Sequence, residues 1–239
     1  MSIVPYFMIK SFLILIHISI LLFSSEQIIL VVSDDFNKSV AKLACYEGSK
    51  QVFLPIEVNI GRNGLGWGIG EIQFSQKSSE PLKVEGDGRA PIGVFKLSTV
   101  FGYAKEASFK MPYFYTSKKL ICVDDGNSQF YNKIIEAHGD EKSFEFMQRK
   151  DNQYKLGIVV QHNTNAIINR GSCIFMHIQK GIHQGTAGCT SMREEDIEKI
   201  AQWLDKNKNP ILIQVPQKLK SEIIKRYPVL KESVLFKAD

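Results

Sequence analysis

The chain lacks the motifs that identify most metal, nucleotide and nucleic-acid proteins. It contains neither a Cys-x-x-Cys pair nor a His-Glu-x-x-His sequence, the common patterns of zinc sites. The glycine-dense stretch 61–70 lacks the Gly-Lys-Ser/Thr ending of a phosphate-binding loop, so we interpret it as irregular backbone. Basic residues do not cluster with aromatic ones, as they do in nucleic-acid-binding surfaces. These absences disfavour zinc, nucleotide and nucleic-acid chemistry.

Long apolar runs are also scarce, and the most prominent apolar run lies near the N-terminus. Ser11–Phe23 is an apolar run of thirteen residues, whereas a membrane-spanning helix needs roughly 20. The run follows the single charge of Lys10 and precedes two serines, which is the order of an export signal. We predict that residues 1–25 are a signal peptide. An uncleaved N-terminal membrane anchor and a buried helix are the alternatives.

Length and charge are compatible with one exported domain. A chain of 239 residues with 44% hydrophobic content can bury one substantial core, and we expect residues 26–239 to form a single domain in the periplasm or cell envelope. The formal net charge is +5, which becomes +4 if residues 1–25, with Lys10, are removed. This mild basicity suits an anionic cell-wall surface, although a solvated charged face explains it equally well.

Cysteine is scarce, with four residues at Cys45, Cys122, Cys173 and Cys189. If the chain is exported and Cys189 is kept free, the other three can form at most one intramolecular pair. A pair between Cys122 and Cys173 and a set of buried free thiols are equal alternatives at this point.

Hydrophobic patterning predicts a strand-rich α+β domain with a few flanking helices. We expect a helix over residues 34–51, with Val40, Leu43 and Ala44 on one face. A second helix is expected after a capping box in which Ser191 is the N-cap and Glu194 reaches back to it. The expected strands are 28–33, 52–60, a short one after the turn at 83–90, 120–123, 158–162, 173–178 and 211–215. The segment 218–227 is amphipathic and follows the last strand.

His177 and Cys189 are the strongest candidates for chemistry. His177 ends the apolar run 172–178, and Cys189 follows Gly188 before the predicted helix. A thiol attacks carbonyls as the thiolate, so it needs a nearby imidazole or a helix N-terminus that lowers its pKa. The predicted capping box places Cys189 two residues before the N-cap, where unpaired amides favour an anion. We therefore expect acyl transfer or amide cleavage; a small buried cysteine and a core histidine are the alternative.

Five blocks of sequence carry a family resemblance. They are Glu85–Phe95, Val123–Asn132, Val160–Asn163, Gly171–Ile178 and Thr186–Met192. With these blocks the chain resembles the L,D-transpeptidase catalytic-domain (YkuD-type) family of bacterial cell-wall proteins. The resemblance extends over roughly residues 61–216, and its most specific part is the histidine followed by Gly-Cys.

The resemblance implies a β-sandwich-like catalytic domain that uses no cofactor or metal. It implies that Cys189 is the nucleophile and His177 its base, and that the substrate is a peptidoglycan stem peptide. The cysteine would form a thioester and pass the acyl group to an amine, or to water in an L,D-carboxypeptidase or endopeptidase. A non-catalytic cell-wall-binding module is a further alternative, and a metal site built from His162, His177, His183 and Cys189 a weaker one. The candidate oxyanion and substrate-binding residues are Thr186, Gly188, Thr190, His162, Asn163 and Arg89.

The chain departs from the common family pattern at two positions. Ala187 stands where the family has histidine in Ser/Thr-His-Gly-Cys, and Ser191 stands where it has arginine. The contacts of those two residues cannot be transferred, so the exact stem peptide stays open. The group that orients His177 also stays open between a backbone carbonyl, Asn163 and His162.

Overall fold

The structure is a computed structural model, and it describes residues 26–236. The predicted signal peptide or anchor, residues 1–25, lies outside the described residues and stays a prediction. Within residues 26–236, no helix is long and apolar enough to cross a membrane.

Most strands belong to one sheet that closes on itself. The closed order is β1-β14-β6-β11-β12-β13-β4-β2, and β2 pairs back with β1. These strands are β1 (Gln27–Ser33), β2 (Val40–Glu47), β4 (Ile56–Asn59), β6 (Ala90–Gly102), β11 (Leu156–Val160), β12 (Phe175–Ile178), β13 (Thr190–Met192) and β14 (Ile211–Pro216). Three short strands extend the sheet: β3 (Lys50–Gln51), β5 (Leu65–Trp67) and β7 (Tyr113–Tyr115). The strand-rich α+β prediction is confirmed, and the layers are joined into a barrel.

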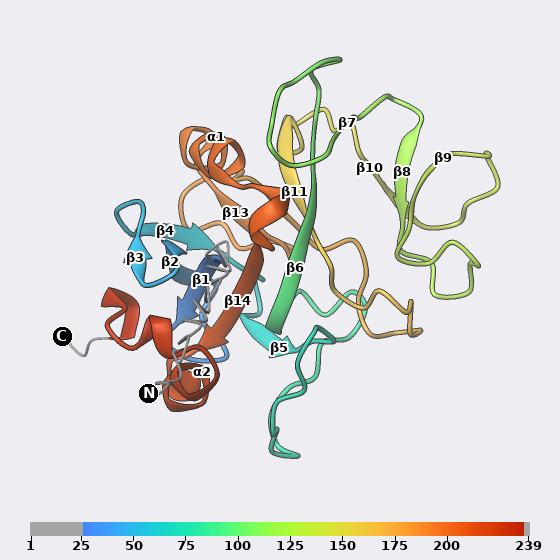
Figure 1. Ribbon diagram of the computed structural model, residues 1–239. Helices are drawn as coiled ribbons and strands as arrows, with labels where there is room; N and C mark the ends of the chain where they lie inside the picture. The colour runs from blue at the N-terminus through green and yellow to red at the C-terminus, as the bar shows by residue number, and fades with distance from the viewer. Residues whose placement is uncertain (1–25, 237–239) are drawn as a thin grey trace, which may run out of the picture.

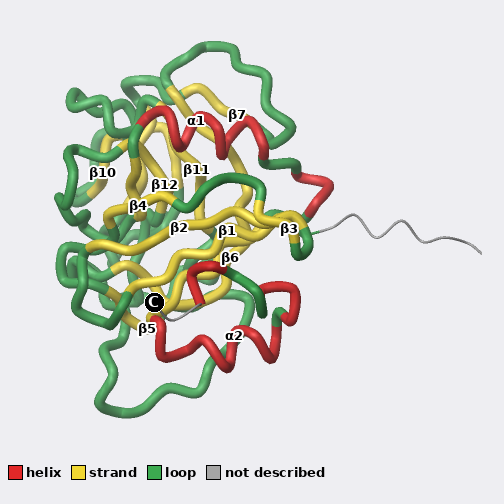
Figure 2. Tube along the Cα trace, turned by 90° about the vertical axis from the view of Figure 1, so that its left-hand side faces the viewer, coloured by secondary structure: helices red, strands yellow, loops and turns green. Residues whose placement is uncertain are grey.

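Two helices pack on opposite sides of the barrel strands, as Figure 2 shows. Helix α1 (Glu194–Trp203) buries Ile197 and, three and four residues later, Ile200 and Ala201, so that the three side chains share one face. Helix α2 (Lys220–Arg226) lies in the predicted amphipathic segment. Four single-turn 3-10 helices complete the C-terminal third: η1 (Lys206–Lys208), η2 (Gln217–Leu219), η3 (Pro228–Leu230) and η4 (Val234–Phe236).

A small second sheet stands beside the barrel, at the upper right of Figure 1. Its central strand β8 (Leu120–Val123) pairs with β9 (Ile134–Glu136) and β10 (Phe144–Phe146). A disulfide between Cys122 and Cys173 ties β8 to the segment that enters β12. This bond decides between the two alternatives left by the sequence, and Cys45 and Cys189 are free thiols.

The predicted helix over residues 34–51 is wrong, because β2 occupies most of it. Residues 43–46 of β2 are consecutively buried. One flank of β2 pairs with β1 and the other with β4. The Tyr46 hydroxyl also meets Ser233 Oγ of the C-terminal segment at 2.6 Å. A strand buried on both faces has no polar alternation, so its apolar run resembles that of a buried helix.

The predicted capping box is also wrong. Ser191 lies inside β13, where it is 1% exposed, and α1 begins only at Glu194. The N-cap residue is Arg193, which makes no side-chain capping bond. Instead, three acidic residues in the first turn of α1 stabilise the helix N-terminus, because their negative charges interact favourably with the helix dipole. Cys189 is therefore separated from the helix by strand β13, and the helix N-terminus does not lower the pKa of its thiol as expected.

Candidate active site

The register of β12 and β13 brings the two predicted reactive residues onto neighbouring strands. These strands are parallel, with His177 opposite Ser191 and Met176 opposite Thr190. Cys189 immediately precedes β13, and its sulfur accepts a hydrogen bond from the Phe175 amide at 3.3 Å. Side chains two residues apart on a strand share a face, so Cys189 lies on the face of β13 that His177 occupies on β12.

The His177 ring is held in one tautomer by a backbone carbonyl. Its Nδ1 atom lies 2.8 Å from the carbonyl oxygen of Ile178. A carbonyl can only accept a hydrogen bond, so Nδ1 carries the proton and Nε2 keeps its lone pair. Asn163 does not orient the ring, because its amide donates to the carbonyls of Ile167 and Gly171. Of the three candidates for the orienting group, the backbone carbonyl is the one observed.

Burial keeps both reactive side chains neutral. Cys189 is 6% exposed and His177 is 4% exposed. Burial raises the pKa of the Cys189 thiol to about 12 and lowers the pKa of His177 to about 4. At pH 7 the site therefore holds a thiol and a neutral imidazole. A thiol in this state needs a base to accept its proton before it can act as a nucleophile, and a neutral imidazole is such a base.

A tight turn leads into Cys189. The Thr186 hydroxyl donates to the Cys189 carbonyl at 2.7 Å and accepts from the Gly188 amide at 3.0 Å. A Cβ at Gly188 would lie 3.0 Å from the Arg89 carbonyl oxygen, so a larger residue would crowd the backbone. Thr186 and Gly188, both predicted to be site residues, thus shape the turn that presents Cys189.

Two other predicted site residues make structural contacts. The Arg89 guanidinium donates to the carbonyl oxygens of Phe36 and Leu65. The Thr190 hydroxyl donates to Gln214 on β14 at 2.7 Å. Both side chains are thereby directed at the protein itself: Thr190 joins β13 to β14, and Arg89 joins its own segment to β5 and to the loop at Phe36.

His162 is buried close to the site without partners for its ring. It is 2% exposed, and neither ring nitrogen has a hydrogen-bond partner within residues 26–236. Burial lowers the pKa of His162 to about 3, with the charges of Lys83 and Arg170 adding to the shift. His162 is therefore a neutral imidazole that does not contact the ring of His177 through a hydrogen bond.

The alternative metal site, built from three histidines and Cys189, is not formed. His183 is exposed and bonds Glu57 at 2.6 Å. Within residues 26–236, the group of three or more metal-ligating side chains that comes together is His138, Asp140 and Glu141, mostly exposed on the surface.

Lys83 is a buried cation that sequence patterning did not identify. It is 2% exposed, and its ammonium pairs with Asp87 at 2.5 Å. A Cβ at Gly188 would lie 3.5 Å from Lys83 Nζ, which places the charge beside the turn before Cys189. This charge lowers the pKa of Cys189, against the larger effect of burial. Lys83 lies in a loop, where no periodic pattern marks a buried side chain.

Tyr154 and Glu145 form a second buried pair that the sequence did not reveal. The Tyr154 hydroxyl donates to Glu145 Oε2 at 2.5 Å, and Tyr154 lies in the same buried cluster as Cys189. The Tyr154 ring packs edge-on against His177, with ring centres 5.2 Å apart. One buried tyrosine thus bonds a carboxylate, packs against the candidate base and belongs to the cluster that contains the candidate nucleophile.

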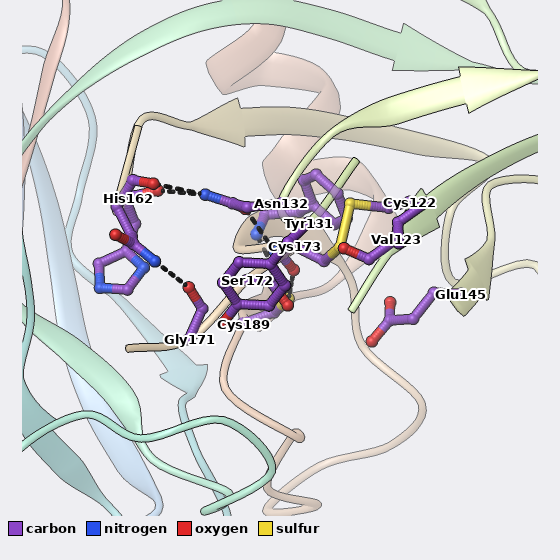
Figure 3. The surroundings of a disulfide bond; sticks show 12 residues. Cys122, Val123, Tyr131, Asn132, Glu145, His162, Gly171, Ser172, Cys173 and Cys189 are labelled. Carbon is purple, nitrogen blue, oxygen red and sulfur yellow. Dashed lines mark hydrogen bonds between the residues drawn. A yellow bond between two sulfur atoms is a disulfide. The ribbon is translucent and has the colours of Figure 1, made fainter. Parts of the chain in front are cut away.

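An asparagine clamp and the disulfide hold the backbone that enters β12, as Figure 3 shows. The amide of Asn132 donates to the carbonyls of His162 and Asn163, and its oxygen accepts from the Cys173 amide at 2.9 Å. Cys173 has a φ of 54°, a left-handed conformation that is unusual for a residue with a side chain. The hydrogen bonds of Asn132 and the disulfide together hold Cys173 in this strained conformation, four positions before His177.

The model of the YkuD family, described as the L,D-transpeptidase catalytic domain, matches residues 28–213. The match begins in β1, ends in β14 and includes both His177 and Cys189. No significant match was found among curated proteins or among solved structures.

Proposed function

The chain belongs to the YkuD family of L,D-transpeptidase catalytic domains, and we propose on this basis that it is an exported cysteine acyltransferase acting on peptidoglycan stem peptides. One observation carries the assignment of residues. His177 presents a free Nε2, fixed by the Ile178 carbonyl, on the strand beside the Cys189 turn. Nucleophile, base and orienting group are the three parts that such a site requires.

The neutral resting state supports general-base attack. Cys189 attacks the carbonyl carbon of the amide that follows the third residue of the stem, and His177 Nε2 takes the thiol proton. The tetrahedral intermediate collapses to a thioester, and the amine leaves with the proton from His177. An acceptor amine then attacks the thioester, a peptide bond forms, and the C–S bond breaks to return Cys189 as a thiol.

Export is supported by the disulfide between Cys122 and Cys173. Structural disulfides persist in oxidising compartments such as the periplasm and are rare in the cytosol. Together with residues 1–25 as a signal peptide, this bond favours a location in the periplasm or cell envelope.

The decisive experiment incubates the purified protein with tetrapeptide and pentapeptide muropeptides and follows the products by mass spectrometry. We expect a covalent adduct on Cys189 and cross-linked dimers or exchanged terminal residues. Shortened stems without cross-links would instead identify an L,D-carboxypeptidase that uses water, and unchanged substrates a non-catalytic wall-binding module.

The matched variants are Cys189→Ala and Cys45→Ala. Cys45 is the other free thiol, buried in the barrel core at 1% exposure. Loss of adduct and products in Cys189→Ala, with both retained in Cys45→Ala, is the expected result. Retention of full activity in Cys189→Ala would show that the nucleophile is another residue.

A further inference from the structure

A large cavity opens along strand β10 of the small sheet. Its volume is about 820 Å³. The wall combines aromatic and charged side chains, among them Tyr103, Lys118, Phe144, Glu145, Phe146 and Arg149. A space of this size accommodates part of a peptide, and its mixed lining suits a ligand with apolar and charged groups.

Glu145 connects the cavity to the reactive pair. The carboxylate forms part of the cavity wall, and its Oε2 accepts the hydrogen bond from Tyr154. Tyr154 in turn packs edge-on against the ring of His177 and lies in the same buried cluster as Cys189. Tyr154 thus links the carboxylate to the candidate base, and the negative charge of Glu145 also acts on Cys189, whose pKa it raises. Within residues 26–236, the Glu145 side chain forms no ion pair.

Arg149, which lines the same cavity and whose charge acts on Glu145, is already engaged elsewhere. Arg149 lies over the ring of Tyr154, 5.1 Å from its centre, and donates from Nε and Nη2 to Asp151. The carboxylate of Glu145 therefore faces the cavity without a protein cation bonded to it. A ligand that brings its own positive charge would complete the pair.

We propose that this cavity binds the ammonium group of the acyl acceptor and that Glu145 removes its proton. This inference rests on the proposed transpeptidase function and names the residue that selects an amine as acceptor. The aromatic wall residues would contact the apolar part of the acceptor peptide and its positive end.

The step balances without a further reactant. The acceptor enters as an ammonium ion and gives one proton to the Glu145 carboxylate. The neutral amine attacks the thioester carbonyl carbon and the C–S bond breaks. The second proton lost by the nitrogen passes through His177 Nε2 to the sulfur of Cys189. Glu145 then releases its proton to solvent through the cavity.

The surroundings of Glu145 make it a stronger base than an exposed carboxylate. Burial raises its pKa, and the negative charges of Asp124 and Glu85 act in the same direction. The Tyr154 hydrogen bond and the charge of Arg149 act in the opposite direction and are outweighed. A carboxylate of raised pKa is better matched to an ammonium proton.

The test separates the two half-reactions in Glu145→Gln. Thioester formation from a tetrapeptide donor is followed by mass spectrometry, and the acyl-enzyme is then offered either glycine or hydroxylamine. Glycine carries an ammonium group at neutral pH, whereas hydroxylamine is mostly unprotonated. We expect unchanged thioester formation, transfer to glycine reduced about 100-fold, and transfer to hydroxylamine close to that of the unmodified protein.

Two further variants control for structural damage. Glu136→Gln removes an exposed carboxylate of the same small sheet, on β9, and should leave both transfers unchanged. Glu145→Asp keeps a carboxylate and should restore part of the transfer to glycine. An equal loss with glycine and hydroxylamine, or no loss at all, would overturn the assignment to Glu145. Failure of the unmodified protein to form any thioester would overturn the transpeptidase proposal and this inference together.

Discussion

The Nδ1 atom of His177 donates to the carbonyl oxygen of Ile178, the next residue of the same strand, at 2.8 Å. The group that orients the candidate base is therefore a backbone carbonyl, and no side-chain substitution removes it. Because the tautomer is fixed locally, Nε2 is available as proton acceptor whatever residue stands at the positions that depart from the common family pattern.

The first prediction concerns the acid limit of thioester formation. Since the pKa of His177 is lowered to about 4, the imidazole stays neutral and able to accept a proton well below pH 6.5. We expect the rate of thioester formation to stay level from pH 8 to pH 5 and to fall only near pH 4. Rapid quenching and mass spectrometry at each pH measure it.

The variant for this test is His177→Gln, which should lose thioester formation at every pH. His183→Gln, at an exposed histidine bonded to Glu57, is the matched control and should behave as the unmodified protein. An acid limit near pH 6.5 would indicate an exposed histidine as the base.

The second prediction concerns the reactivity of Cys189. With a pKa of about 12, the sulfur is a thiol at pH 7, and alkylation by iodoacetamide should be slow and should accelerate as the pH rises. Lys83→Met removes a buried positive charge beside the Cys189 turn. It should raise the pKa of Cys189 further and slow alkylation at any given pH.

Cys45→Ala is the background for this experiment, so that Cys189 is the free thiol that reacts. Lys96→Met is the control, because Lys96 is exposed and pairs with Glu71 at the surface. Rapid alkylation at pH 7 in the unmodified protein would mean that Cys189 rests as a thiolate.

Much of the fold follows from sequence, and the largest failure has a clear physical origin. The strands 28–33, 120–123 and 211–215 and the helix around Ile197 and Ile200 are confirmed, because each has a clear period or a buried run between turns. The helix predicted over residues 34–51 is wrong because β2 is buried on both faces, and a continuous apolar run does not distinguish a strand from a helix.

The site shows the same division. Cys189 and His177 could be selected from chemistry and local motif alone. Lys83, Glu145 and Tyr154 could not, because the first and last lie in loops and Glu145 lies on a three-residue edge strand. Their roles come from contacts between distant segments. The disulfide stayed open for that reason too, since Cys122 and Cys173 are 51 positions apart.

The third prediction concerns that disulfide. A bond that closes a loop of 51 residues lowers the entropy of the unfolded chain and stabilises the fold by about 4 kcal/mol. The double variant Cys122→Ala and Cys173→Ala should lose about that much free energy of unfolding, measured in urea. Thioester formation should fall as well, because the strained Cys173 backbone before His177 loses one of its two restraints.

Cys45→Ala tests whether loss of any buried cysteine has this effect. The change in stability that Cys45→Ala itself causes should be the same in oxidised and in reduced protein, because only the Cys122–Cys173 pair differs between the two. An unchanged stability of the double variant would show that Asn132 and the surrounding strands hold the segment alone.

The fourth prediction concerns stability at acid pH. His162 has a pKa of about 3 in the folded protein and about 6.5 in the unfolded chain. The unfolded chain therefore binds the extra proton first, and the stability contributed by the neutral ring is lost as the pH falls below 6.5. Between pH 7 and pH 5 this loss is about 2 kcal/mol.

The variants test this loss by urea unfolding at each pH. The free energy of unfolding of His162→Gln should decline less between pH 7 and pH 5 by that amount, while His183→Gln should follow the unmodified protein. His177, with a pKa of about 4, contributes a loss of similar size in every variant that retains it. Equal slopes for His162→Gln and the unmodified protein would mean that His162 gains a proton, and hence a partner, in the folded state.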